Sequence, residues 1–481
     1  MYIKELVTEL KLLRSQSEID VHGISIEIDK INKGDLFFDL KGDKNINTIF
    51  ERGAAFVIRL GNTNRSEGEK IWSCTSPREI YALASKRYFK NCCDKMKIIG
   101  ITGTNGKSSV AKLVYDIFSW KGRKVGMIGT MGCRYDNTEI ETGFTTPDPF
   151  ILHKLFYQMH KCGIEYVVME VSAHAIELKK LSGIKFDIFA LTNISQDHLD
   201  FFGNMEKYAS TKLSMFDKKY IKQGIVCVDD DRARALVEKV NVPLITYGVE
   251  NPSDIFAIDI EESFDGTKFI CNCLDEISII QTNLVGGYNV LNTLCAIGIC
   301  NICGMDIVDI TCALRYAEAE VGRFNIIKYD GINIVIDFAH TPDGLEKVLQ
   351  TAKSICEGRL IVLFGCGGNR DASKRKIMGS VAEKYADEIF LTNDNPRLEN
   401  PMEIVSQIAE GIKEKNHHIE LDRKLAIYQA ISFCERGDCL IIAGKGGEKY
   451  QDIGGIKIPY SDFDEVYKFF RNNITLVNKG S

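Results

Sequence analysis

From about residue 96 onward, short uninterrupted apolar runs alternate with amphipathic helical stretches, and this pattern limits the fold more than any other feature. Strands without polar alternation, separated by helices, indicate parallel sheets covered on both faces. Such sheets bind their ligands beyond the carboxyl ends of the strands. Helical patterns lie between many of the runs, for example at 108–122 and 342–356. The expected strands are 97–103, 166–172, 188–194, 224–230, 332–338, 359–365, 388–394 and 439–446.

The chain of 481 residues exceeds what one ordinary hydrophobic core holds, so we expect three domains. Residues 1–95 contain short strands and no clear ligand signature. Residues 96–320 form the central domain, and residues 321–481 form a third, because a long helical stretch gives way to new strands near residue 321. The expected fold class is α/β: a central parallel-sheet domain with a phosphate loop, a C-terminal Rossmann-like domain and a smaller N-terminal α/β domain.

Composition and charge exclude several classes of protein. The formal net charge is −6 and the basic residues are scattered, which argues against a nucleic-acid surface. No apolar run is long enough to span a bilayer, and the first residues mix charges into an apolar helical pattern, so we expect a cytoplasmic protein without membrane insertion. The 16 cysteines lie mostly in apolar segments without paired zinc spacing, which indicates reduced core thiols. We expect a monomer that acts on small molecules.

The segment 98–110, IIGITGTNGKSSV, combines an apolar strand, glycines and a lysine that opens a helix. Glycines let backbone N–H groups converge on phosphate oxygens, and a helix N-terminus adds positive potential. Ile101 stands where the pattern G-x-x-x-x-G-K-[ST] has its first glycine, so a glycine-rich βα turn is the alternative. The sequence predicts an ATP site formed by Gly103, Thr104, Asn105, Gly106, Lys107 and Ser108.

Two further polar residues follow neighbouring strands. Glu170 ends one apolar run, and carboxylate oxygens suit Mg²⁺. His198 follows the next run and offers a second metal position. Alone, each has an ordinary alternative, a solvated carboxylate and a hydrogen-bonded loop histidine. Beside a phosphate loop they predict a magnesium site that includes Ser108.

The segment TGTNGKSS and nine later blocks, in the same order along nearly the whole chain, resemble the Mur ligases, and most of all their type E members. Mur ligases are ATP-dependent enzymes that build the stem peptide of peptidoglycan. The resemblance implies a carbon–nitrogen ligase that uses ATP and Mg²⁺ and passes through an acyl phosphate. The blocks are GFTTPDP (143–149), MEVSAHA (169–175), LTNISQDHLDFFG (191–203), GGYNVLN (286–292), GRF (322–324), IDFAHTPDGL (336–345), FGCGGNRD (364–371), TNDNPRLENP (392–401) and GKGGEKYQ (444–451).

The resemblance also assigns roles to single residues. It implies that Lys212, which would ordinarily be an exposed helix lysine, is carboxylated by CO₂ and adds an anionic oxygen near the metals. Asn289, Asn292, Arg323 and Asp337 are expected at the nucleotide. Without the resemblance, the asparagines could be cap or turn residues, and Arg323 could form an ion pair at the domain boundary. The residues expected to act in catalysis are Lys107, Glu170, His198, Lys212 and Arg323.

Type E members add a diamino acid, commonly meso-diaminopimelate or lysine. Diaminopimelate differs by a distal carboxylate, which a selective pocket would hold with a bidentate cation, and Arg397 in DNPR supplies one. Glu448 would pair with the distal ammonium. Gly447 stands where the family commonly has histidine, and Arg397 as a surface ion pair is the alternative. The pocket residues implied are Arg370, Asp394, Asn395, Pro396, Arg397, Gly444 and Glu448.

The expected reaction adds meso-diaminopimelate to UDP-N-acetylmuramoyl-L-alanyl-D-glutamate. The residues expected at this UDP-linked substrate are Thr145, Thr146, Ser172, Lys180 and His340. The N-terminal region departs from the family, because Glu27-Ile28-Asp29 replaces the usual Asp-Ser-Arg. Three alternatives stay open: a Mur-like ligase with another carrier, such as a folylpolyglutamate or cyanophycin type of substrate, a lysine-adding ligase, and a non-catalytic Mur-like partner protein.

Overall fold

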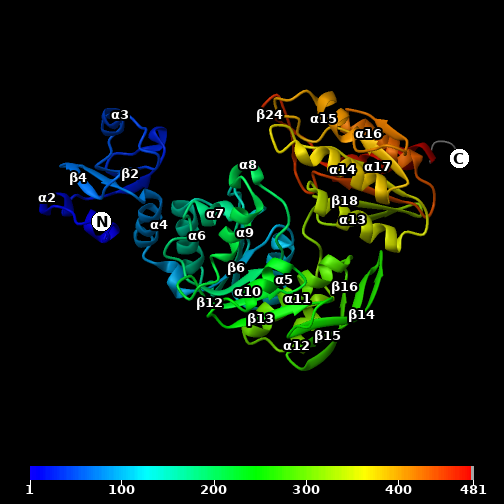
Figure 1. The fold of residues 1–481 in the computed structure, drawn as a ribbon, viewed down its shortest axis with the longest axis horizontal. Coiled ribbons are helices and arrows are strands. Elements are labelled where there is room, and N and C mark those ends of the chain that lie inside the picture. The colour runs from blue at the N-terminus through cyan, green and yellow to red at the C-terminus, as the bar shows by residue number, and fades with distance from the viewer. Residues whose placement is uncertain (478–481) are drawn as a thin grey trace.

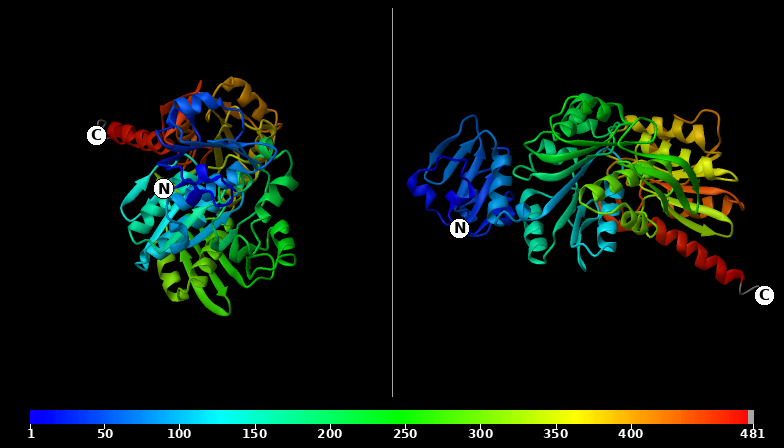
Figure 2. Two further views of the ribbon diagram at one scale, coloured as in Figure 1. Left: turned by 90° about the vertical axis from the view of Figure 1, so that its left-hand side faces the viewer. Right: turned by 90° about the horizontal axis from the view of Figure 1, so that it is seen from below.

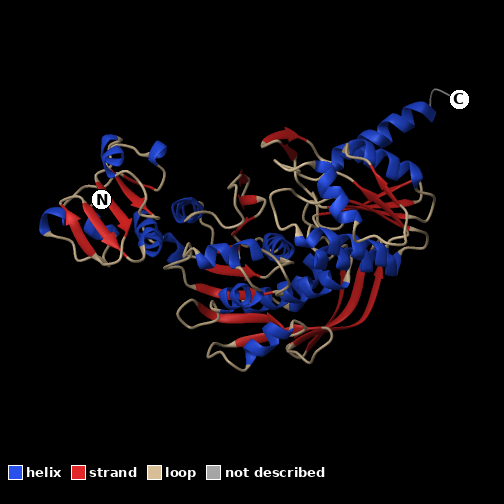
Figure 3. Ribbon diagram, turned by 45° about the horizontal axis from the view of Figure 1, so that its top comes forward, coloured by secondary structure: helices blue, strands red, loops and turns tan. Residues whose placement is uncertain are grey.

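The computed structural model describes residues 1–477 and contains three large sheets, with five, eleven and six strands (Figure 1). Each large sheet is formed within one of the three expected regions, and the N-terminal and third sheets lie at opposite ends of the molecule. Helices cover the sheets, as Figure 3 shows with strands in red and helices in blue. The predicted α/β class with three domains is confirmed, whereas the limits of the domains stay predictions.

The N-terminal sheet has the order β1-β2-β3-β5-β4, and its core contains Phe38 and Trp72. Helix α4 (Pro77–Tyr88) leads into the central region and packs against α6 (Pro149–Lys161). The other elements are α1 (Ile3–Leu6), α2 (Arg14–Ser17), β1 (Gly23–Ser25), β2 (Asp35–Asp39), α3 (Ile46–Glu51), β3 (Phe56–Leu60), β4 (Arg65–Gly68) and β5 (Ile71–Cys74).

The central sheet has the order β16-β15-β14-β13-β12-β11-β6-β10-β7-β8-β9. Its middle strands are parallel, as expected, but both edges are antiparallel hairpins, which the apolar runs did not predict. The strands are β6 (Lys97–Thr102), β7 (Val125–Gly129), β8 (Gly132–Tyr135), β9 (Thr138–Ile140), β10 (Tyr166–Glu170), β11 (Phe186–Leu191), β12 (Ile221–Cys227), β13 (Leu244–Gly248), β14 (Ile255–Ser263), β15 (Gly266–Cys273) and β16 (Glu276–Thr282).

Helices bury both faces of the central sheet, which explains why its inner strands are apolar at every position. Ile99 belongs to the buried cluster that includes residues of α5 (Lys107–Trp120), α11 (Gly287–Ile302) and α12 (Ile307–Leu314). Its neighbour Ile98 points to the opposite face, into the cluster that includes residues of α6. The remaining helices of this region are α7 (Ala173–Glu177), α8 (Leu199–Phe202), α9 (Met205–Leu213) and α10 (Asp231–Val237).

The third sheet has the order β17-β18-β22-β19-β20-β21, and only the β17–β18 pair is antiparallel. A separate hairpin, β23–β24, follows it, and α17 (Asp462–Val477) extends away from the body in the right view of Figure 2. The elements are β17 (Asn325–Tyr329), β18 (Ile332–Asp337), α13 (Pro342–Ile355), β19 (Leu360–Phe364), α14 (Ser373–Tyr385), β20 (Glu388–Leu391), α15 (Pro401–Ala409), β21 (His417–Ile419), α16 (Arg423–Phe433), β22 (Cys439–Ala443), β23 (Tyr450–Ile453) and β24 (Ile456–Pro459).

The eight expected apolar runs correspond to strands β6, β10, β11, β12, β18, β19, β20 and β22. Most of the cysteines are buried, as expected for core thiols, and all of them are unpaired. Within residues 1–477, no helix has the length and apolar character needed to cross a membrane.

Candidate active site

The phosphate loop joins the end of β6 to the start of α5. Gly103 and Gly106 have φ values of +154° and +86°, which side chains rarely adopt. A Cβ on Gly106 would lie 2.4 Å from the Asn292 side-chain oxygen, so this turn also needs a residue without a side chain. The loop therefore places the N-terminus of α5 where an anion can bind to it.

Lys107 folds over this loop. Its Nζ donates to the carbonyl oxygens of Gly103 at 3.0 Å and Thr104 at 2.8 Å. Burial lowers the pKa of Lys107, and the nearby carboxylates of Glu170 and Asp197 oppose that shift. An anionic phosphate at the loop would likewise favour the charged ammonium.

Glu170 lies beside the loop because β10 pairs with β6, with Glu170 opposite Ile101. Its side chain accepts hydrogen bonds from Ser108 Oγ at 2.9 Å and from the Thr130 backbone N–H at 2.8 Å. With 3% of its surface exposed, Glu170 is not the solvated carboxylate of the alternative interpretation. Ser108 and Glu170 thus offer two adjacent hard oxygen ligands.

His198 lies on the loop after β11, with its side chain 45% exposed and its Nε2 3.4 Å from Asp197. Within residues 1–477, no group of three or more His, Cys, Asp or Glu side chains is arranged to hold a metal ion. Magnesium, however, commonly takes one or two protein oxygens and completes its shell with phosphates and water. The pair Ser108 and Glu170 fits that mode of binding.

Lys212, on α9, is buried, with 1% of its surface exposed, so the ordinary expectation of an exposed helix lysine is wrong here. Its Nζ donates to Tyr208 Oη at 2.6 Å and to Thr104 Oγ1 at 3.2 Å. Burial and the nearby Lys107 charge lower the pKa of Lys212 well below its usual range. Burial therefore favours the neutral form of this amine, which lies directly behind the phosphate loop.

The expected nucleotide residues come from three segments. Asn289 and Asn292 lie within α11 and are joined by a 3.0 Å hydrogen bond, so they are not turn residues. Asp337 ends β18 and accepts backbone hydrogen bonds at 2.7 Å; burial raises its pKa to about 6, and Arg323 opposes the shift. The Arg323 guanidinium lies 4.7 Å from the centre of the Phe338 ring. It forms no ion pair with any residue from 1 to 477.

Four of the five expected carrier residues lie in the central region. Thr146 Oγ1 donates to the Glu170 carbonyl at 2.9 Å and accepts from the Ser172 N–H at 3.0 Å. Thr145 lies 3.1 Å from Thr130, whereas Lys180 is held by Asp148 at 2.7 Å.

The fifth, His340, belongs to the third region. Its Nδ1 lies 3.0 Å from the Phe338 carbonyl oxygen. Burial lowers the pKa of His340 to about 4, and the charge of Lys374 adds to the shift. This imidazole is therefore neutral at pH 7.

The expected amine residues meet at the carboxyl ends of β20 and β22. Asn395 Nδ2 donates to Glu448 Oε2 at 2.9 Å. Arg397 has a φ of +52° and donates to the Gly368 carbonyl at 2.6 Å. Its Nε lies 3.9 Å from Asp452, too far for a strong surface ion pair. Asp394, Pro396 and Gly444 are buried in the same two loops, and Arg370 is exposed.

Three residues of this neighbourhood were not expected from the sequence. Lys445 is fully buried beside Glu448, Tyr208 contacts Lys212, and Asp343 of α13 reaches the phosphate loop. The only sequence signals were local: Lys445 is three residues before Glu448, and Tyr208 is four residues before Lys212 on the same helix.

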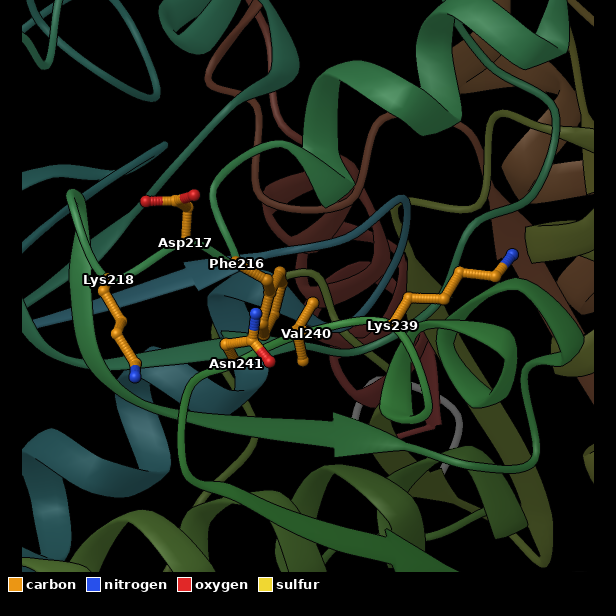
Figure 4. A pocket seen from close by; sticks show the side chains of 6 residues that line it. All are labelled: Phe216, Asp217, Lys218, Lys239, Val240 and Asn241. Atoms are coloured by element: carbon orange, nitrogen blue, oxygen red, sulfur yellow. The ribbon is translucent and has the colours of Figure 1, made fainter.

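A hollow of about 460 Å³ lies elsewhere on the central region (Figure 4). It is formed by segments that precede β12 and β13, so it lies at the amino ends of these strands. The phosphate loop follows the carboxyl end of the parallel strand β6. The hollow is therefore separate from the candidate site. Its lining residues are Phe216, Asp217, Lys218, Lys239, Val240 and Asn241.

Together, a phosphate loop in an α/β sheet and a third domain whose loops face it define the class of a multidomain nucleotide-binding protein. The Mur ligase middle domain matches residues 101–300, and the "Mur ligase, glutamate ligase domain" matches residues 322–446. The chain belongs to the Mur ligase family.

The similarity extends over nearly the full length. A UDP-N-acetylmuramoyl-L-alanyl-D-glutamate--2,6-diaminopimelate ligase from Caldanaerobacter subterraneus subsp. tengcongensis is 36% identical, covering 94% of this chain and 95% of the relative. A solved structure of a ligase with the same name has a TM-score of 0.72 at 28% identity and covers 98% of this chain and 99% of its own. MurF ligase from Thermotoga maritima in complex with ADP shares the fold, with a TM-score of 0.62 at 18% identity and coverage of 94% and 97%.

Proposed function

We propose that this protein is an ATP-dependent ligase that joins meso-diaminopimelate to UDP-N-acetylmuramoyl-L-alanyl-D-glutamate, a step in peptidoglycan precursor synthesis. One observation carries the proposal: the phosphate loop with Glu170 and the pocket with Arg397 and Glu448 occur in one chain, on domains that touch. The 36% identity to a ligase of that name over nearly the whole chain supports it.

In the first step, an oxygen of the carrier carboxylate attacks the γ-phosphorus of ATP, and the bond to the bridging oxygen of ADP breaks. Lys107 would exchange its two carbonyl partners for phosphate oxygens and stabilise the transferring group. Ser108 and Glu170 would hold Mg²⁺, which neutralises phosphate charge when bound. Asn289, Asn292 and Asp337 would orient the nucleotide, and Arg323 would reach its phosphates as the domains close.

In the second step, the amine attacks the carbonyl carbon of the acyl phosphate, and the tetrahedral intermediate expels inorganic phosphate while the nitrogen loses a proton. Thr145, Thr146, Ser172, Lys180 and His340 would hold the carrier for this step. Orientation of the two reactants supplies much of the rate. The pocket at the ends of β20 and β22 would present the amine from the third domain.

We further propose that Lys212 reacts with CO₂ to form a carbamate, in which the nitrogen bonds the carbon and releases a proton. Two observations support the modification. Nζ is buried against Tyr208 and Thr104, and burial lowers the pKa of Lys212, which favours the nucleophilic neutral amine. The product is an anionic oxygen ligand next to the phosphate loop.

The test is release of ADP and phosphate with UDP-N-acetylmuramoyl-L-alanyl-D-glutamate and a panel of amines. We expect turnover only when carrier and diaminopimelate are both present. Equal ATP turnover with and without the amine would overturn the ligase proposal. Turnover with carrier and L-lysine, but not with carrier and diaminopimelate, would favour the lysine-adding alternative.

Ligation to a different carrier is the one alternative function that a structural observation favours. In the N-terminal region, Asp29 is 91% exposed and its nearest cation, Arg52, lies 3.6 Å away, while Glu27 pairs with Lys30. These side chains form a solvated surface instead of a preformed uridine site. Replacing the muramoyl dipeptide by other acyl carriers in the same assay distinguishes the two functions.

A further inference from the structure

Lys445 is a fully buried cation in the pocket of the third domain, and the reaction described above gives it no role. It follows Gly444 in the loop after β22, and its side chain is 0% exposed. Its Nζ lies 2.8 Å from Glu448 Oε2 and 3.1 Å from Asn395 Oδ1. Because burying an ammonium is costly without a counter-charge, the contact with Glu448 offsets the cost of burying Lys445.

Glu448 makes its contacts through one oxygen only. Oε2 accepts from both Lys445 Nζ at 2.8 Å and Asn395 Nδ2 at 2.9 Å. Among residues 1–477, none donates a hydrogen bond to Oε1, and the side chain is 25% exposed. The carboxylate is therefore held through Oε2, whereas Oε1 is left without a protein donor among these residues.

The amide of Asn395 completes the arrangement. Its Oδ1 accepts from Lys445 Nζ and also from the Asp452 backbone N–H at 2.9 Å, and its Nδ2 donates to Glu448. The loops after β20 and β22 are thus joined by a closed network of hydrogen bonds. Connected hydrogen bonds of this kind hold the three side chains in one arrangement.

Lys445 also acts electrostatically on a second carboxylate, that of Asp394. Burial raises the pKa of Asp394, the nearby Glu448 charge adds to that shift, and Lys445 opposes it. Without the Lys445 charge, repulsion from Glu448 would raise the pKa of Asp394 further.

We propose that Lys445 is a positioning residue: it holds the Glu448 carboxylate in one orientation, so that the free carboxylate oxygen accepts an ammonium of the incoming diamino acid. This inference rests on the proposed function. Diaminopimelate and lysine both carry that ammonium. Lys445 therefore strengthens the binding of both amines and does not choose between them, which separates its role from that of Arg397.

Steady-state kinetics of Lys445→Met test the proposal. We expect the KM for meso-diaminopimelate to rise by about tenfold or more, as for loss of an oriented charged hydrogen bond, with the KM values for ATP and carrier unchanged. The ratio of kcat/KM for diaminopimelate to that for lysine should stay within about twofold, since both amines lose the same contact. Lys468→Met is the matched control, because Lys468 pairs with Glu465 at the same three-residue spacing on α17.

A double-mutant cycle with Glu448→Gln separates positioning from a general structural role. If Lys445 acts through Glu448, the double variant should be no worse than Glu448→Gln alone. Additive effects, an unchanged KM for the amine, or a parallel rise in the KM for ATP would each overturn the inference. If circular dichroism shows that Lys445→Met does not fold, Lys445→Gln replaces it, because glutamine keeps a hydrogen-bond donor at this position. The same three results then overturn the inference. If the wild-type protein ligates no diamino acid, the proposed function is overturned together with this inference. That result is obtained before any variant is made, so it is distinguishable from a failure of the inference alone.

Discussion

Asn105 in the phosphate loop donates a 2.7 Å hydrogen bond to Asp343 in the first turn of α13, which ties the nucleotide site to the third domain. The same Asp343 oxygen accepts from Ser195 Oγ at 3.2 Å and from Lys347 Nζ at 3.1 Å. A carboxylate at this point places negative charge beside the loop that would receive the phosphates of ATP. The contact therefore competes electrostatically with the proposed nucleotide.

Replacing Asp343 by Asn keeps a hydrogen-bond acceptor and removes the charge. We expect the Kd for ADP or a non-hydrolysable ATP analogue to fall by about fivefold, equivalent to roughly 1 kcal/mol of relieved repulsion across a partly solvated contact. Isothermal titration calorimetry without carrier or amine measures it. Asp306→Asn, at the cap of α12, is the control with the same chemical change. Weaker binding by Asp343→Asn would contradict the argument.

Lys212→Ala should lose most of the ligase activity, because the proposed carbamate oxygen beside the phosphate loop disappears. Added formate or acetate should restore part of it by occupying the vacated space. Mass spectrometry of the native protein in bicarbonate checks the modification independently, as a gain of one CO₂. A fully active alanine variant together with an unmodified lysine would reject the carbamate.

The ion pair between Arg423 and Asp462 is completely buried, with both side chains 0% exposed. Arg423 also donates to the carbonyls of Asn393 at 3.2 Å and Ala443 at 2.9 Å, the last residues before Asp394 and Gly444. Asp462→Asn leaves a buried guanidinium without its counter-charge and should destabilise the third domain by about 3–5 kcal/mol.

Denaturant unfolding followed by a probe in the third domain measures this loss. The exposed pair Lys353–Asp387, at 2.7 Å, is the control, and Lys353→Met should cost less than about 1 kcal/mol. Equal effects at the two pairs would show that burial of the Arg423 pair does not matter.

The sequence was most informative where strands are buried on both faces. The run at 97–103 is apolar at every position because Ile98 and Ile99 contact different helix layers, and such runs stand out in a sequence. The sequence did not predict the hairpin edge β14–β16, where the two-residue turn Phe264-Asp265 joins β14 to β15 and Gly266 opens β15. Its alternation is weakened by exposed isoleucines such as Ile277 and Ile279, 73% and 57% exposed.

Site residues inside motifs could be named from the sequence, but their environments could not. Lys212 is buried because α9 packs it against Thr104, 108 residues earlier in the chain. The sequence did not indicate a role for Lys445, because that role depends on Asn395, which lies beside it on a separate loop. Such long-range contacts leave no periodic signal within one segment.

The exposed side chains at Glu27 and Asp29 predict weak recognition of the uridine end of the carrier by the N-terminal region. Asp29→Ala should change the KM for the UDP-linked dipeptide by less than about twofold, because a side chain that is 91% exposed has little binding free energy to lose. Kinetics with carrier as the varied substrate provide the measurement. A tenfold rise in KM would show instead that this triplet forms the uridine site.

Arg397 should determine the choice between meso-diaminopimelate and lysine. Its guanidinium is held by the Gly368 carbonyl at 2.6 Å and is only 26% exposed, so it is oriented and partly desolvated before substrate arrives. Diaminopimelate can pair with it through the distal carboxylate, whereas lysine leaves it unpaired. Losing that charged hydrogen bond costs about 2–5 kcal/mol, or roughly thirty-fold to several thousand-fold in kcat/KM.

Arg397→Ala should therefore damage the diaminopimelate reaction far more than any residual lysine reaction and bring the two kcat/KM values together. Arg370→Ala, which removes an exposed arginine near the same pocket, should have a smaller effect in the same direction. Both amines are compared in the wild type and in each variant, with ADP release as the readout. If lysine is the better substrate of the wild-type protein, Arg397 does not select the distal carboxylate, and the amine pocket must be assigned again.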